Sequence, residues 1–171
     1  MHLADTGPAC ATDEAKRLLL VTSFFVDETD AHLAVLAQAV RDGVLEGIRV
    51  YIKPHPYLPV EDRLVRLFPQ GGAPEIVDRP VGELLVPGTF VWASNSTTVA
   101  LEAALRGLPV MVQTAENDFD LCPLQDLPGL VRICNSADLA RVLASTFCLK
   151  LPQAYLAIDP GLPRWRKLLD L

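Results

Sequence analysis

The sequence predicts an α/β protein with three layers, built on a doubly wound, mostly parallel sheet of six strands. Short apolar runs alternate along the chain with segments of helical periodicity. Most connections between them are short, as right-handed crossovers in such sheets require. Half of the residues are hydrophobic and the mean hydropathy is +0.27, which fits strands that are buried on both faces of a parallel sheet.

The composition, net charge and cysteine count of the sequence favour one domain and exclude several classes of protein. Residues 1–15 are polar and lack the features of a signal peptide, so we expect a flexible lead-in followed by a single Rossmann-like domain over residues 16–171. No apolar run approaches the ~20 residues of a transmembrane segment. A net charge of −6 argues against general nucleic-acid binding. Four widely spaced cysteines suggest reduced thiols and a cytoplasmic protein.

The first half of the domain is predicted to alternate strands and helices. The apolar run RLLLVTSFF, which starts at Arg17, is typical of a central parallel strand. Asp27 is expected to cap a helix whose apolar residues recur at helical spacing over residues 31–42. A strand, an amphipathic helix, a weak strand and a helical turn are then expected at residues 49–53, 60–68, 75–77 and 80–85.

The second half is organised around the stretch FVWASNSTTVALEAALRGLPVMVQ at residues 90–113. It predicts a strand at 90–93, a polar turn at 94–98, an Ala- and Leu-rich helix at 99–106 and a strand at 110–113. Gly107 is placed to end the helix in a left-handed conformation. An irregular loop, a strand, a helix capped by Ser136 and a final helix are expected at residues 114–129, 130–134, 137–147 and from 162 or 163 onward.

The best candidate for a binding site is the edge where the strands end. Ligands of doubly wound sheets bind beyond the carboxyl ends of the strands, where the turns at residues 24–30, 54–57 and 94–98 would open. A polar turn before a helix start favours a phosphate there, and the pattern fits Ser94 or Asn95 as a structural helix cap equally well. His55 is held between two prolines on the same edge and could donate a hydrogen bond to a phosphate oxygen.

Two further side chains are secondary candidates. If the helix starts near Ser96, then Glu102 shares a face with Asn95, Thr98 and Arg106. Glu102 could then accept hydrogen bonds from ribose hydroxyls, or it could pair with Arg106 on a solvent-exposed stripe. Lys53 could complement a diphosphate, although a lysine at a strand end needs no such role.

Other chemistries receive less support. The nucleotide-binding patterns GxGxxG and GxxxxGK[ST] and the hydrolase pattern GxSxG are absent. A nucleophilic triad of Ser96, His55 and an aspartate remains geometrically possible. The three histidines are far apart in the sequence and suggest no metal site. Asp118 and Asp120 form an acidic pair in the long loop, where such residues are usually only solvated.

Two motifs carry a resemblance to a known family. KPHP, followed about 40 residues later by SNSTTVALEAALRGLPVMV, resembles the C-terminal, donor-nucleotide-binding domain of GT-B glycosyltransferases. The likeness is greatest to bacterial surface- and capsule-carbohydrate enzymes, including the sialyl- and Kdo-transferase groups, and the closing DPGLPRWRKLL resembles the end of a bacterial surface-carbohydrate biosynthesis family. The matching site residues are His55 and Pro56 of a His-Pro motif, Ser94, Ser96, Thr97 and Thr98 of a phosphate-holding Ser/Thr motif, and Glu102 at a ribose-binding position.

The resemblance implies a ligand and a missing half. The expected ligand is a nucleotide sugar such as a CMP- or UDP-sugar, bound without a metal or a cofactor. A complete GT-B enzyme has two domains and this chain matches one, so an N-terminal half or a partner subunit would be needed for transfer, and no catalytic residue is assigned. Two alternatives remain open: half of a protein like a nucleotide-sugar 2-epimerase, and a non-catalytic module that binds a nucleotide or a partner protein.

Overall fold

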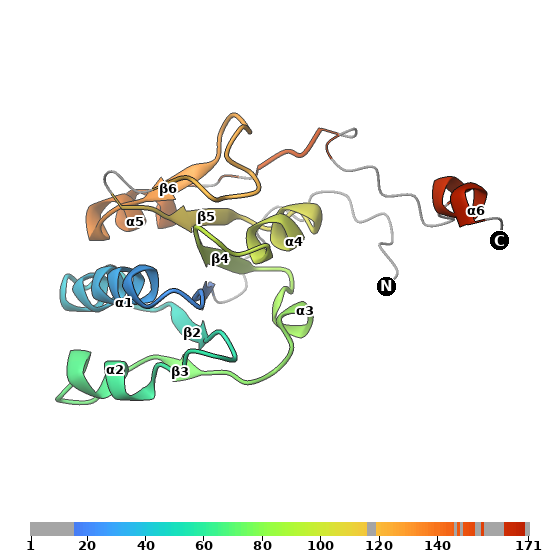
Figure 1. Ribbon diagram of the computed structural model, residues 1–171. Helices are drawn as coiled ribbons and strands as arrows, with labels where there is room; N and C mark the ends of the chain where they lie inside the picture. Colours follow the sequence, from blue (N-terminus) through green and yellow to red (C-terminus); the bar gives the residue numbers. More distant parts are fainter. Residues whose placement is uncertain are drawn as a thin grey trace.

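A six-stranded, fully parallel sheet covered by helices on both faces forms the domain (Figure 1). The computed structural model describes residues 16–115, 119–145, 147, 149–152, 155 and 163–169, so the expected lead-in and Asp118 lie outside the described residues. The strands are β1 (Arg17–Val21), β2 (Arg49–Lys53), β3 (Glu75–Ile76), β4 (Thr89–Ser94), β5 (Val110–Gln113) and β6 (Val131–Ile133). The helices are α1 (Val26–Arg41), α2 (Glu61–Leu67), α3 (Val81–Leu84), α4 (Val99–Leu105), α5 (Ser136–Leu143) and α6 (Pro163–Leu169).

The order of the strands confirms the predicted fold class. The sheet runs β3-β2-β1-β4-β5-β6, so the chain moves outward from β1 to β3, returns to the centre at β4 and then moves outward on the other side. β1 and β4 are therefore neighbours, and Arg17 lies opposite Thr89 at the start of both strands. This point of reversal is where a doubly wound sheet forms a crevice beyond its carboxyl edge.

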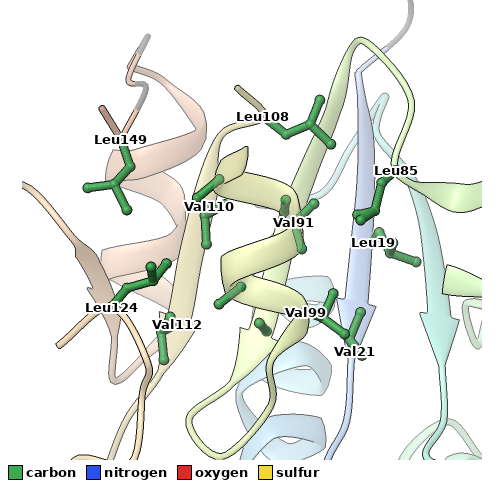
Figure 2. Close-up of a cluster of buried hydrophobic side chains, with 14 of the residues drawn as sticks. Leu19, Val21, Leu85, Val91, Val99, Leu108, Val110, Val112, Leu124 and Leu149 are labelled. Carbon is green, nitrogen blue, oxygen red and sulfur yellow. The ribbon is translucent and has the colours of Figure 1, made fainter. Parts of the chain in front are cut away.

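Two apolar cores separate the three layers. Leu18 and Leu20 of β1 face the core shared with α1, α2 and α5, whereas Leu19 and Val21 face the core shared with α3 and α4. This alternation follows from the period of two residues in a strand. Figure 2 shows the second core, in which Leu19 and Val21 lie beside Val91 and Val99. Both faces of the central strands are thus apolar, as the hydropathy of the sequence predicts.

Three helices differ from the sequence prediction in their first residue or in the residue that caps them. The first helix begins at Val26 and not at residue 31, and Asp27 lies in its first turn and does not cap it. The start is earlier because Ser23 bonds the incoming turn: its Oγ accepts from the N–H of Phe25 at 3.0 Å and its carbonyl accepts from the hydroxyl of Thr29 at 3.0 Å. Asp27 still lies at the positive end of the helix dipole.

At α5 the cap is Asn135 and not Ser136. The side chain of Asn135 accepts from the N–H of Asp138 at 3.0 Å, and the carboxylate of Asp138 in turn accepts from the N–H of Cys134 at 3.1 Å. These two bonds satisfy backbone donors on both sides of the helix start, as a capping box does. Ser136 instead donates to the carboxylate of Asp42 at 2.6 Å, which ties α5 to the end of α1.

At α4 the polar turn precedes the helix and does not cap it through Ser94 or Asn95. Ser94 is the last residue of β4, and the helix begins at Val99 after Thr98, whose side chain makes no capping bond. Gly107 has a φ of +70°, which confirms the predicted left-handed end of the helix. Residues 95–98 thus form a separate loop between strand and helix. Their donor groups bond to residues of other segments of the chain.

Candidate functional site

The turn between β1 and α1 connects the ends of β1 and β2. Thr22 and Ser23 follow β1 and are both buried. The hydroxyl of Thr22 accepts from the backbone N–H of His55 at 3.2 Å, and the N–H of Thr22 donates to the carbonyl of Lys53 at 3.2 Å. The proline-bounded histidine is therefore fixed against the end of β1, at the carboxyl edge where the sequence predicts it.

A carboxylate from α1 reaches the polar turn after β4. Glu28 accepts two hydrogen bonds from Ser96, one from the backbone N–H at 3.0 Å and one from the hydroxyl at 2.6 Å. A carboxylate that accepts two donors from one residue makes a charge-assisted contact, which is stronger than a bond between neutral groups. In the described structure the Ser96 donors therefore bind an anion, and that anion belongs to the protein itself.

Ser94 and Asn95 support the turn from beneath and are almost entirely buried. Ser94 Oγ lies 3.2 Å from Nδ1 of His32. The ring of His32 packs edge-on against the ring of Trp92, with the ring centroids 4.4 Å apart. Burial lowers the pKa of His32 to about 3, so the ring is neutral at physiological pH. Asn95 donates to the carbonyl of Phe119 at 2.6 Å. Both residues position the turn, and neither is exposed to an incoming ligand.

The outer part of the turn is accessible. Thr97 is half-buried, with its hydroxyl 3.3 Å from the N–H of Val99, and Thr98 is exposed. Glu102 is half-buried in the first turn of α4. Because the helix starts at Val99, the expected helical face shared by Glu102 and Asn95 is not formed.

The ion pair that the sequence suggested between Glu102 and Arg106 is also not formed among the described residues. The guanidinium of Arg106 donates to the carbonyls of Gly82 and Leu85 at 2.6 and 3.0 Å and so ties the end of α4 to α3. Glu102 lies on α4 one turn beyond Thr98, whose carbonyl accepts its N–H at 3.2 Å. Its carboxylate is therefore not engaged by the cation that the i,i+4 spacing suggested.

Aromatic side chains surround His55. Its half-buried ring lies between Phe24, with centroids 5.7 Å apart, and Tyr57, with centroids 5.5 Å apart, and Phe24 contacts Phe25 at 3.9 Å. We call Phe25, Phe24, His55 and Tyr57 the aromatic row. Nδ1 of His55 lies 3.3 Å from the N–H of Tyr57, so that nitrogen is the acceptor and the proton is assigned to Nε2. The adjoining Pro56 is exposed.

Lys53, the secondary candidate, is paired within the protein. Its ammonium lies 3.3 Å from the carboxylate of Asp78, which is fully exposed. Exposed ion pairs of this kind contribute little to stability. The lysine is thus at the carboxyl end of β2 as predicted, but a ligand would have to replace Asp78 as its partner.

Sequence reasoning missed Thr22, Ser23, Glu28 and His32. The two hydroxyl residues follow an apolar strand just as Ser94 does, so the same argument could have found them. Glu28 and His32 occupy adjacent turns of one face of α1. Their partners, Ser96 in the turn after β4 and Ser94 at the end of β4, are more than 60 positions away in the sequence, and only the strand order brings them together.

The fold is found in known proteins of low sequence identity. The chain is similar in structure to Methanocaldococcus jannaschii UDP-GlcNAc 2-epimerase, solved in complex with UDP-GlcNAc and UDP, with a TM-score of 0.57, 13% identity, and coverage of 92% of this chain and 46% of that one. It also matches the E. coli heptosyltransferase WaaC with ADP, with a TM-score of 0.49, 16% identity, and coverage of 78% and 44%. No protein-family model and no curated protein matches the sequence.

These comparisons establish the fold and its extent. The Rossmann-like domain expected from the GT-B resemblance is confirmed at the level of the fold. The chain spans less than half the length of the two structures it matches. In the described part of the chain, no helix is long and apolar enough to cross a membrane.

Proposed function

We propose that this chain is the nucleotide-sugar (donor) binding domain of a glycosyltransferase of cell-surface polysaccharide biosynthesis. One observation carries the proposal: the segment that follows β1 contacts His55 through the hydroxyl of Thr22, and it contacts Ser96 through the carboxylate of Glu28 in the first turn of α1. His55 and Ser96 are thereby connected to the same segment at the switch point of the sheet, where doubly wound folds bind nucleotides. The Rossmann-like fold and the two sequence motifs agree with that assignment.

The candidate residues have distinct roles in this proposal. Ser96, Thr97 and Thr98 supply hydroxyl and N–H donors to a phosphate, and Ser94 and Asn95 hold the turn that carries them. His55 donates from Nε2 and Pro56 restricts its backbone. Such preformed donors stabilise the charge that develops on a departing nucleotide. Glu102 is assigned to the ribose hydroxyls, and Lys53 is a further cation for a diphosphate.

Transfer itself needs groups that we place outside this domain. The chain covers only 46% of the UDP-GlcNAc 2-epimerase that it resembles. We therefore assign the acceptor site to an N-terminal half or a partner subunit, and we expect this domain alone to bind its nucleotide without transferring sugar.

The second candidate is half of a protein like a nucleotide-sugar 2-epimerase, and the fold similarity to the archaeal UDP-GlcNAc 2-epimerase favours it. The two candidates differ in the base that they should select. A sialyl- or Kdo-transferase-like domain should prefer a cytidine nucleotide. An epimerase-like half should prefer UDP.

The decisive experiment is a titration of the domain with CMP, CDP and UDP, followed by backbone amide NMR. We expect shifts at His55 and at Ser96–Thr98, and the base with the lowest Kd separates the two candidates. His55→Ala should raise the Kd of the nucleotides about tenfold, as expected for a lost charge-assisted hydrogen bond. It should leave binding of the phosphate-free nucleoside unchanged. Arg66→Ala, at an exposed position of α2, is the matched control. No shifts at millimolar nucleotide would overturn the proposal.

A further inference from the structure

A polar cavity lies at the opposite end of the strands from the polar turn. Its volume is about 130 Å³. Arg17 and Thr89, the first residues of β1 and β4, line it together with Arg79 and Glu83 from the segment that leads into and forms α3. Leu19, which also lines it, belongs to the core covered by α3 and α4 (Figure 2). The proposed function uses none of these residues.

The cavity carries more positive than negative charge. Arg17 is half-buried and Arg79 is exposed, and neither guanidinium has a hydrogen bond or an ion pair among the residues that the structure describes. Glu83 is the one carboxylate that lines the cavity, so the ionised groups sum to a charge of +1. A guanidinium presents its N–H donors in a planar fork that matches the oxygens of a phosphate or a carboxylate.

The buried hydroxyl of Thr89 is the second, independent indication of a ligand. Thr89 is 2% exposed, and within the described residues its Oγ1 has no hydrogen-bond partner. A buried hydroxyl without a partner is unfavourable, and such groups in native proteins call for an explanation. Thr89 lies opposite Arg17 in the parallel pair of β1 and β4. Because residues at matched positions of neighbouring strands project to the same face, the hydroxyl and the guanidinium are adjacent in the cavity wall.

We propose that this cavity binds a small tetrahedral oxyanion, either inorganic phosphate or the phosphoryl group of a small metabolite. Arg17 and Arg79 supply the charge, and Thr89 supplies a hydroxyl donor from the buried end. Pockets for whole nucleotides or drug-sized ligands are about 300–1,000 Å³, so this cavity accepts the phosphoryl group and excludes the remainder of a nucleotide. Glu83 opposes the anion and limits its affinity.

The test is a titration with sodium phosphate in a low-salt buffer, followed by amide NMR of the whole chain. We expect shifts at Arg17, at Thr89 and at Val86, which also lines the cavity. Arg17→Gln and Arg79→Gln should each raise the Kd for phosphate about tenfold, and Glu83→Gln should lower it about threefold, because one charge is removed in each case. Arg66→Gln on α2 is the matched control and should leave the Kd unchanged. A titration with sodium acetate should give at least tenfold weaker binding.

Thr89→Val separates binding from folding, because valine keeps the shape of threonine and lacks its hydroxyl. It should raise the Kd for phosphate about fivefold and leave the midpoint of urea unfolding in phosphate-free buffer unchanged or higher. If this variant folds poorly, Arg79→Gln decides alone, since Arg79 is exposed. Equal phosphate affinity in wild type and Arg79→Gln, or acetate as tight as phosphate, overturns the proposal. Shifts confined to residues 94–98 overturn it as well and leave the donor-site proposal standing.

Discussion

At the residue scale, Glu28 determines what the Ser96 donors bind. Its carboxylate engages both the N–H and the hydroxyl of Ser96. A phosphate at the same donors would have to displace this carboxylate or lie beside it. Two like charges a few ångströms apart repel each other, so Glu28 lowers the affinity of the turn for anions.

Glu28→Gln should therefore strengthen nucleotide binding at the proposed donor site. Glutamine keeps an oxygen acceptor for Ser96 and removes the negative charge, so we expect the Kd of the preferred nucleotide to fall about tenfold. Isothermal titration calorimetry measures this directly. Glu61→Gln, at an exposed acid of α2, should have no effect. If Glu28→Gln binds more weakly while its urea midpoint is unchanged, Glu28 is a ligand contact and not a competitor.

His32 gives the second prediction at this scale, the dependence of stability on pH. Burial depresses its pKa from the ordinary value of 6.5 to about 3, so the unfolded chain takes up a proton at pH values where the folded protein does not. His32 thus leaves stability intact above pH 6.5 and reduces it as the pH falls toward 3. Between pH 6.5 and 4.5 the free energy of unfolding falls by about 2–3 kcal/mol because of His32.

Urea unfolding at several pH values measures this slope. The comparison is with His32→Gln, which keeps a polar partner for Ser94 and does not titrate. The carboxylates contribute equally to both proteins, so the difference between the two slopes belongs to His32. Parallel slopes would show that the histidine is protonated as readily in the folded protein as in the unfolded chain.

At the scale of single elements, the start of α5 depends on one side chain. Asn135 caps the helix through the N–H of Asp138, while the neighbouring Ser136 bonds Asp42 at the end of α1. The hydrogen bond from Ser136 is the main reason that the pKa of Asp42 is lowered. The two adjacent polar residues thus serve different elements, one the helix itself and the other its packing.

Asn135→Ala should reduce the free energy of unfolding by about 1 kcal/mol, because it leaves a helix N–H without its acceptor. Ser136→Ala is the matched comparison and should cost less, since its partner is fully exposed. Urea denaturation of both variants checks the order. A larger loss of unfolding free energy for Ser136→Ala than for Asn135→Ala would show that Ser136, and not Asn135, caps the helix.

At the scale of the whole molecule, exposed aromatic side chains gather at the carboxyl edge of the sheet. In the aromatic row, Phe24 is 52% exposed and Tyr57 is 88% exposed, and Phe119, whose carbonyl bonds Asn95, is 85% exposed. Exposed apolar patches of this kind mark surfaces that contact another molecule. An edge of this kind is suited to contact with another domain or with a second copy of the chain.

We accordingly expect weak self-association of the isolated domain through this edge. Sedimentation velocity over a range of protein concentrations should show a reversible increase in mass. The double variant Phe24→Ser with Tyr57→Ser should weaken the association about tenfold, because it removes two exposed rings from the contact. Val65→Ser on α2, at a position 71% exposed and away from this edge, should not. Association that the double variant leaves unchanged would place the contact elsewhere.

The sequence by itself determined the elements and the edge at which they end. Strand and helix periods, together with glycine and proline at the boundaries, predict five of the six strands to within about one residue, because these signals are local. The first strand begins at Arg17 as predicted, but it ends at Val21, before the end of the predicted apolar run. They also place His55 and the polar turn at the carboxyl ends of their strands. Helix starts were less predictable, since several neighbouring polar residues can cap a helix, as Asn135 and Ser136 show.

Only the tertiary structure decided which of these residues meet. Nothing local in the sequence states that β1 lies beside β4, yet that pairing alone brings Glu28 to Ser96 and His32 to Ser94. The same pairing places Arg17 beside Thr89 at the other end of the sheet. The order of strands is set by the simultaneous burial of both sheet faces by helices, a condition on the whole chain that no short segment can satisfy alone.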